Sequence, residues 1–396
     1  MAEEFDLIVV GGGPVGLSCG WQARERGART LVLDKTGFLN EQCGTSGAER
    51  HWRLQYTQQD LFRLTLAALP EWRRLESLAD RKLIHEIGSL WFGDVTVSTN
   101  EGRIADTARN MDRFDVRYEW MTAAEIERRF GFRNLPSHFE GFLQPDGGTI
   151  DVRATLGALY GLAQANGVVL RGGEAVRELV PDADGVTVRT DRGSYRAAKV
   201  LLATGPFVND LLEPLGARLD VNIFEMALVS LRLAQPDRDF PFWFVFQQPT
   251  EDDTNLFYGF GRNPWSPHEQ VRLGPDFEVN PIRHASKATG RPDPRHVDRV
   301  SAWVAEHLPA LDPEPVRGST CLAVLPADPN RQFYLGTAGN LVPHGENVVV
   351  CAAGWGFKFV PLLGGICADL ALEGTTTHDI SRLSPTRAAH EATSAR

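Results

Sequence analysis

The chain has 396 residues, of which 42% are hydrophobic and 23% charged, a balance typical of a folded globular protein. Acidic residues outnumber basic ones by 51 to 41, and the resulting net charge of −10 disfavours nucleic acid and anionic membranes as partners. The apolar runs are too short to span a membrane, the first residues lack a signal sequence, and the five cysteines show no CxxC spacing. We therefore expect a cytoplasmic protein without a metal site or a disulfide framework.

The first 34 residues predict a strand–helix–strand unit with a glycine-rich turn. An apolar run at 5–10 ends at the pattern Gly11-x-Gly13-x-x-Gly16, an amphipathic helix follows, and a second apolar run ends at Asp34. The glycines allow a pyrophosphate to approach the helix N-terminus, and the aspartate can accept hydrogen bonds from a ribose. A plain glycine turn is the alternative. The strand, the helix and the aspartate together favour a dinucleotide site. The pattern does not show whether the dinucleotide is NAD or FAD.

The rest of the chain alternates between α/β segments and mixed segments. We expect helices over 61–78, 152–166 and 361–372, and mixed strands and short helices over 85–146. We expect a strand pair at 167–171 and 186–189, with a polar turn near 191–193. Further strands are expected at 200–205, which is buried, at 242–246, which is rich in aromatic residues, and at 348–351.

The predicted fold class is α/β, with two interleaved domains. Residues 1–84, 147–215 and 316–396 are assigned to a nucleotide-binding domain, and residues 85–146 and 216–315 to a mixed-sheet substrate domain.

A second small-residue turn, Ala203-Thr204-Gly205-Pro206, follows the buried strand at 200–205. One fingerprint at the start of the chain together with such a turn is typical of FAD enzymes with the glutathione-reductase-like fold. The sequence has no second GxGxxG pattern for a nicotinamide cofactor. This absence favours dioxygen as the electron acceptor.

Separated motifs resemble those of monomeric sarcosine oxidase and its D-amino acid oxidase-like relatives. The segment 354–358, Gly-Trp-Gly-Phe-Lys, is similar to the family's Gly-His-Gly-Phe-Lys, and the segment 44–53 is similar to its loop with two arginines three apart. Cys321 precedes the segment 333–336 at the spacing of the family's covalent flavin cysteine. The resemblance runs from Phe5 to about Leu372.

This resemblance implies an FAD oxidase with a Rossmann-like FAD domain, and it implies roles for individual residues. Cys321 is expected to carry the flavin through an 8α-S-cysteinyl thioether, and Arg50 to pack against the flavin ring. Arg53 and Lys358 are expected to clamp a substrate carboxylate. A monomer is expected.

Two positions depart from the family pattern. Trp355 stands in place of a histidine and offers a flat wall for a planar ring. Relatives carry an oxygen-activating lysine on the strand that here holds Phe257 or Tyr258, so oxygen activation is assigned to Lys358 or Arg53.

The segments 47–56, 87–94 and 354–361 resemble one branch of the family in particular. That branch oxidises a cyclic imino acid, piperideine-2-carboxylate, to picolinate in two two-electron steps, with O2 reduced to H2O2, in the biosynthesis of nikkomycin-type antibiotics. The resemblance implies this activity here and places Glu101, Tyr258 and Asp276 near the substrate, with Glu101 as a proton acceptor.

The alternatives are a sarcosine or N-methyl amino acid oxidase with a single two-electron step, a non-catalytic flavin-binding subunit, and an NAD-dependent dehydrogenase. The expected substrate-site residues are Arg53, Glu101, Tyr258, Asp276, Trp355 and Lys358. The expected cofactor-binding residues are Gly11, Gly13, Pro14, Val15, Gly16, Asp34, Lys35, Thr45, Ser46, Arg50, Val176, Thr204, Gly205, Cys321, Gly354, Gly356, Phe357 and Lys358.

Overall fold

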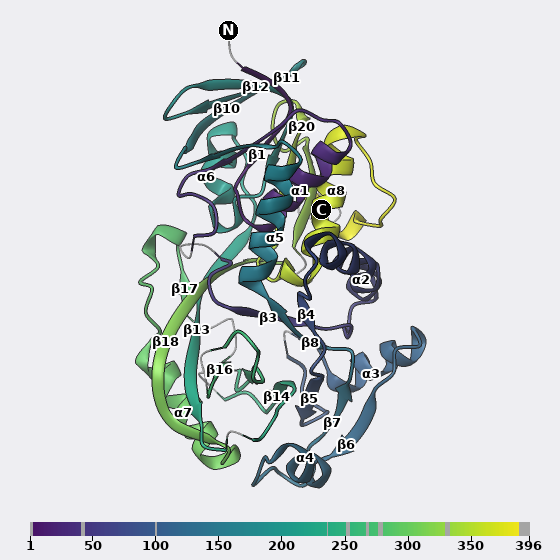
Figure 1. Cartoon of the computed structure of the whole chain (residues 1–396), viewed down its shortest axis with the longest axis vertical. Coiled ribbons are helices and arrows are strands. Elements are labelled where there is room, and N and C mark those ends of the chain that lie inside the picture. The colour runs from purple at the N-terminus through teal and green to yellow at the C-terminus, as the bar shows by residue number, and fades with distance from the viewer. Residues whose placement is uncertain are drawn as a thin grey trace, which may run out of the picture.

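A computed structural model of the chain describes residues 3–40, 44–99, 101–235, 237–250, 254–266, 269–275, 280–328 and 333–387. Its strands form three sheets, of eight, nine and three strands. Figure 1 shows the eight-stranded sheet and its helices in the upper half of the molecule and the nine-stranded sheet in the lower half. The predicted α/β architecture is confirmed, whereas the division into two domains stays a prediction.

The eight-stranded sheet contains the predicted strand–helix–strand unit. Its strands are β1 (Glu3–Val10), β2 (Thr30–Asp34), β9 (Val169–Gly172), β10 (Val176–Asp182), β11 (Gly185–Thr190), β12 (Ser194–Leu202), β19 (Tyr334–Gly339) and β20 (Gly345–Ala352). The strands β2, β1, β12 and β20 are parallel, so their carboxyl ends meet at one edge of the sheet. In doubly wound folds, ligands bind at this edge.

Apolar residues alternate along β1 between two cores. Leu7 and Val9 face the core that includes α1 and α8, while Ile8 and Val10 face a second core on the opposite side of the sheet. Both faces are therefore covered, and Figure 1 shows α1, α5 and α8 grouped beside the sheet. The helices are α1 (Pro14–Glu25), α2 (Gln59–Ala79), α3 (Ile104–Arg113), α4 (Ala123–Phe130), α5 (Val152–Ala165), α6 (Val208–Leu212), α7 (Pro294–His307) and α8 (Val360–Leu372).

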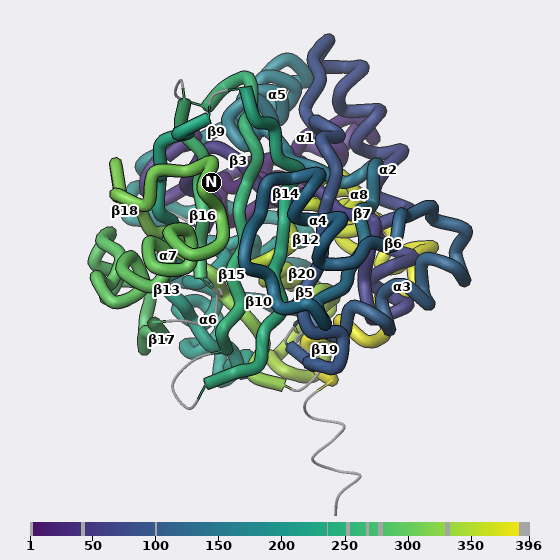
Figure 2. Tube along the Cα trace, turned by 90° about the horizontal axis from the view of Figure 1, so that it is seen from below, coloured from purple at the N-terminus to yellow at the C-terminus, as the bar shows by residue number. Residues whose placement is uncertain are grey.

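The nine-stranded sheet is the second layer, and Figure 2 views the molecule from the end that carries it. Its strands are β5 (Ser89–Gly93), β6 (Glu119–Thr122), β7 (Glu140–Gln144), β13 (Val221–Leu233), β14 (Phe242–Phe246), β15 (Phe257–Gly259), β16 (Gln270–Pro275), β17 (Pro281–Ile282) and β18 (Leu311–Pro326). The long antiparallel strands β13 and β18 run from one half of the molecule to the other (Figure 1). They bring Cys321 opposite Met226.

Shorter elements connect the two layers. The third sheet contains β3 (Glu49–Trp52), β4 (Ile84–His85) and β8 (Gly148–Asp151). Five short 3-10 segments complete the described elements: η1 (Gly205–Phe207), η2 (Glu213–Leu215), η3 (Ala285–Lys287), η4 (Gly356–Phe359) and η5 (Ser381–Leu383). In the described part of the chain, no helix has the length and apolar character that crossing a membrane requires.

One expected pairing is wrong. The strand near 167–171, observed as β9, pairs in parallel with β2, and not with the strand near 186–189. That second strand, β11, pairs with β10 and β12, and the polar turn near 191–193 joins β11 to β12. The reason is that β9 forms the edge of the parallel sheet beside β2, so its pairing depends on packing of the whole sheet and not on the next strand along the chain.

Candidate active site

A cavity of about 330 Å³ lies between the carboxyl ends of the parallel strands and the aromatic strands of the second sheet. Most of the predicted site residues line it: Gly11, Gly13, Pro14, Val15, Asp34, Lys35, Thr45, Arg50, Arg53, Glu101, Val176, Thr204, Gly205, Tyr258, Cys321, Gly354, Trp355, Gly356, Phe357 and Lys358. Gly16 and Ser46 do not line it: Gly16 is packed against the Gly11 carbonyl, and Ser46 Oγ donates to the Thr320 carbonyl at 3.2 Å. Asp276 lies outside the described residues.

Two glycines in the turn between β1 and α1 differ in the space around them: Gly13 is open to a ligand, whereas Gly11 is enclosed by protein. Gly11 has φ of +110°, and a Cβ there would lie 2.4 Å from the Ala203 carbonyl oxygen. A Cβ on Gly13 would meet no atom within 4 Å, and the same holds for Gly205. Because both open positions line the cavity, the backbone there can approach a pyrophosphate at the N-terminus of α1. These residues fit the predicted dinucleotide.

The Asp34 carboxylate is oriented by backbone donors. One oxygen accepts from Gly12 N at 2.9 Å, and the other accepts from Thr36 N and Gly37 N, each at 2.9 Å. A carboxylate has about four lone-pair sites, so capacity remains for a ribose hydroxyl. Lys35 and Val176 line the same end of the cavity.

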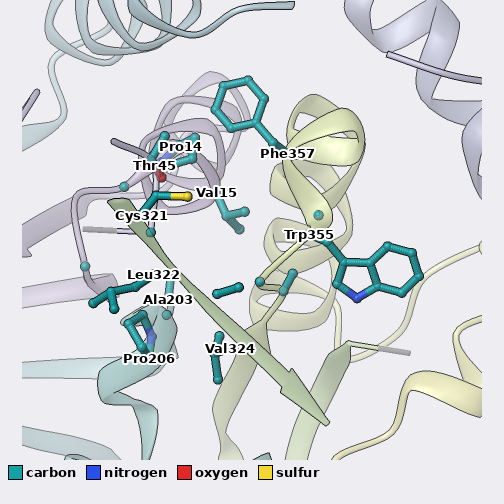
Figure 3. Close-up of a pocket in the computed structure, with 18 of the residues that line it drawn as sticks. Pro14, Val15, Thr45, Ala203, Pro206, Cys321, Leu322, Val324, Trp355 and Phe357 are labelled. Atoms are coloured by element: carbon teal, nitrogen blue, oxygen red, sulfur yellow. The ribbon is translucent and has the colours of Figure 1, made fainter. Parts of the chain in front are cut away.

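Cys321 lies on β18 and turns its thiol into the cavity. Figure 3 draws Cys321 with Thr45, Pro14, Val15, Trp355 and Phe357 among the residues that line the cavity. The nearby loop is held by Arg50, which donates to the carbonyls of Gly44 at 3.1 Å and Ser46 at 2.7 Å. A thiol in this place fits the expected covalent attachment of a flavin, but the thioether itself stays a prediction. Four described cysteines are free thiols.

The other end of the cavity is cationic. Arg53 follows β3 and forms an ion pair with Glu101, with 2.6 Å between Nη1 and Oε2. Lys358, on η4, donates from Nζ to the Trp355 carbonyl at 3.1 Å. All three charged residues are buried. The Arg53 Nε has no hydrogen-bond partner among the described residues, although it is fully enclosed.

The two cations differ in how strongly they hold their protons. Burial opposes the charge of Arg53, but Glu101 and Tyr56 together outweigh burial and raise the pKa of the guanidinium. Burial, and then the charge of Arg53, hold the pKa of the Lys358 ammonium well below its usual value, although Glu101 acts in the opposite direction. Arg53 is therefore a permanent charge, whereas Lys358 can lose its proton.

Flat aromatic side chains form the walls between these charges. Tyr258 on β15 packs against Phe242 and Phe244 of β14, with ring centroids 6.3 and 5.3 Å away. Trp355 lies 6.1 Å from the ring of Tyr56, and its indole N–H is buried without a partner in the described part of the protein. Planar walls of this kind suit a planar ring as ligand.

Two partly buried polar groups were not predicted from the sequence. His51 lines the cavity, stacks on Phe242 with centroids 3.5 Å apart, and places Nε2 2.8 Å from Ser89 Oγ. Arg272 on β16 pairs with Glu49 at 2.6 Å. Isolated histidines and arginines give no sequence signal, because only the pairing of distant strands makes them neighbours. Of the two positions expected to replace the family's lysine, Tyr258 lines the cavity, whereas Phe257 packs on Trp303.

The comparisons with known proteins agree with this fold and cavity. Residues 6–370 match the family of FAD dependent oxidoreductases, and the chain belongs to that family. It is an FAD-dependent oxidoreductase of the amino acid oxidase class.

One solved structure, NikD, described as an unusual amino acid oxidase essential for nikkomycin biosynthesis, is 67% identical, with a TM-score of 0.92 over 97% of this chain and 98% of that one. This similarity confirms the expected relationship to the sarcosine oxidase-like flavoenzymes.

More distant relatives share the whole length of the chain. Human peroxisomal sarcosine oxidase is 27% identical over 96% of this chain and 95% of its own, and a Bacillus monomeric sarcosine oxidase is 26% identical over 98% and 97%. L-proline dehydrogenase from P. horikoshii, 18% identical with a TM-score of 0.80 over 99% of both chains, shares the fold. The chain spans only 37% of a longer relative, a bifunctional amine oxidase of Dictyostelium discoideum that is 29% identical over 98% of this chain.

Proposed function

We propose that this enzyme oxidises piperideine-2-carboxylate to picolinate in two two-electron steps, with O2 as electron acceptor, in nikkomycin-type antibiotic biosynthesis. The observation that carries the proposal is the buried Nε of Arg53 in the cavity wall, which has no hydrogen-bond partner among the residues that the structure describes. A buried donor without a partner is costly, and a ligand carboxylate removes that cost by accepting its hydrogen bond. The 67% identity to NikD supports this choice of substrate.

The residues expected to bind the substrate carboxylate, Arg53 and Lys358, have different roles. Glu101 already holds Nη1 of Arg53, which leaves the Nε edge of the guanidinium for a substrate carboxylate. Lys358 adds a second positive charge beside it, because its Nζ lies 5.9 Å from the centroid of the Tyr56 ring, over which the Arg53 guanidinium lies at 4.2 Å. Tyr258 and Trp355 then hold the ring between aromatic surfaces, which fixes the orientation of its reacting carbon.

A bound FAD would supply the hydride-accepting and O2-reducing chemistry, with H2O2 as the reduced product. Gly13, where the backbone is open to the cavity, would hold its pyrophosphate within the turn that Gly11 permits, and Asp34 would hold its ribose. Cys321 supplies the thiol for a covalent thioether. Glu101 accepts a proton released from the substrate ring, and Arg53 or Lys358 provides the positive charge that favours reaction with O2.

The test compares the wild-type enzyme with Arg53→Lys, which keeps the charge but cannot bind a carboxylate through a guanidinium edge. We expect wild-type enzyme to form picolinate from piperideine-2-carboxylate, and kcat/KM to fall by about 10- to 100-fold in the variant, as loss of charge-assisted hydrogen bonds predicts. Sarcosine is the rival substrate. Turnover of sarcosine without picolinate formation from the cyclic imino acid contradicts the proposal.

A further inference from the structure

A buried hydrogen-bond chain leads from the second sheet into the cavity through His51. Gln55 Nε2 donates to Ser89 Oγ at 2.6 Å, and Ser89 Oγ lies 2.8 Å from His51 Nε2. Gln55 and Ser89 are fully buried, and the His51 ring is held flat against Phe242. The ring therefore has one fixed orientation, which the packing and the hydrogen bond determine together.

The chain of donors also fixes which nitrogen of His51 carries the proton. Ser89 Oγ receives a hydrogen bond from Gln55, and the acceptor available for its own proton among the described residues is His51 Nε2. A neutral imidazole that accepts at Nε2 carries its proton at Nδ1. Burial and the charges of Arg53 and Lys358 hold the pKa of His51 well below its usual value, which keeps the ring neutral.

The Nδ1–H group has no partner among the described residues, and His51 lines the cavity. Arg53 comes two residues after His51, directly after the end of β3, and both residues line the cavity. A carboxylate bound to Arg53 therefore places the rest of the ligand beside His51.

We infer that His51 is a substrate-binding residue whose Nδ1–H donates a hydrogen bond to the sp² ring nitrogen of the unsaturated heterocycle. Arg53 and Lys358 already supply charged donors for the carboxylate, so the neutral donor serves the ring. A neutral donor binds the in-plane lone pair of an imine or pyridine nitrogen and gains nothing from a carbon at that position. His51 thus selects ligands with a ring nitrogen. This inference rests on the proposed carboxylate site.

The test measures binding of two ligands of the same shape, picolinate and benzoate, to the purified holoenzyme by titration calorimetry. Benzoate has a C–H where picolinate has its ring nitrogen. We expect wild-type enzyme to bind picolinate about 5- to 10-fold more tightly, the effect of one neutral hydrogen bond. In His51→Phe, which keeps a ring against Phe242, the two affinities should become equal while benzoate affinity is retained.

Two further variants separate the hydrogen bond from packing. The side-chain amide nitrogen of His51→Asn takes the position of Nδ1, so this variant should keep the preference for picolinate. The amide nitrogen of His51→Gln takes the position of Nε2, so this variant should lose the preference, and it serves if His51→Phe does not fold. An equal affinity of the two ligands in wild-type enzyme, or an unchanged preference in His51→Phe or His51→Gln, overturns the inference.

A separate variant, Arg53→Lys, tests the carboxylate site of the proposed function. Arg53→Lys should weaken binding of picolinate and benzoate by the same factor, because both carry the carboxylate. If Arg53→Lys leaves both affinities unchanged, the carboxylate clamp is wrong. If it weakens both while His51 variants leave the preference intact, only the role of His51 is wrong.

Discussion

Lys358 and Arg53 share one cavity but respond differently to pH. The pKa of Lys358 is lowered by burial and by Arg53, whereas Glu101 helps to keep Arg53 charged. Two neighbouring groups stay neutral just above pH 7, because burial lowers the pKa of His51 well below its usual value and raises that of Tyr56. Loss of the Lys358 proton is then the event that changes carboxylate binding in this range.

We therefore expect benzoate affinity to fall as pH rises through the lowered pKa of Lys358. A bound carboxylate favours the protonated lysine, so affinity is full below the pKa of Lys358 and declines above it, by up to tenfold per pH unit. Titrations of the holoenzyme at several pH values measure this slope. Lys358→Met should bind more weakly at pH 7 and show a flat profile. A slope that persists in Lys358→Met would assign the titration to another group.

Cys321 is tested by denaturing the protein. If its thiol carries the flavin, acid-precipitated wild-type protein keeps its yellow colour, and mass spectrometry shows a chain heavier by one FAD. Cys321→Ser, nearly the same in size, should release the flavin on precipitation. The matched control is Cys367→Ser, because Cys367 lies on α8 and does not line the cavity. This control variant should keep the bound flavin. Flavin retention in Cys321→Ser would exclude this linkage.

At the scale of elements, two glycines of the β1–α1 turn are expected to have different roles, Gly11 in folding and Gly13 in cofactor binding. Gly11 is enclosed by the Ala203 backbone, whereas Gly13 faces open space in the cavity. Gly13→Ala should lower the flavin content severalfold and leave the melting temperature of flavin-free protein unchanged. Gly11→Ala should lower that melting temperature as well, because its Cβ meets backbone at a positive φ. Equal effects of both substitutions would contradict this division.

The same scale shows what the sequence could predict. The helices at 61–78, 152–166 and 361–372 appear within two residues of their expected limits. The apolar periodicity of α2 and the Asp151 cap of α5 are short-range signals that a sequence records. The parallel pairing of β9 with β2 depends on a contact across more than 130 residues and was missed. Pairing of that kind is decided by packing of the whole sheet, which no local pattern records.

The candidate site follows the same rule. Motif residues such as Gly11, Arg53 and Lys358 were predicted and do meet in one cavity. The ion pair between Arg53 and Glu101 and the chain from Gln55 to His51 could not be predicted, because the partners come from separate segments.

At the scale of the whole molecule, the two layers of the fold line different parts of the cavity. The parallel sheet presents backbone and Asp34 to the dinucleotide, and the second sheet presents aromatic walls to the substrate. The clamp residues lie between them, on the segment after β3 and on η4. In the proposed reaction, this arrangement holds the ring of the cyclic imino acid beside the cofactor, so an imine product that stays bound is oxidised a second time.

The most direct test of that account is a count of H2O2 formed per molecule of piperideine-2-carboxylate consumed by purified enzyme in air. Two oxidation steps predict two molecules of H2O2 and one of picolinate for each substrate molecule. One H2O2 without an aromatic product would contradict the double oxidation. No H2O2 from this substrate, with rapid formation from sarcosine, would contradict the account as a whole.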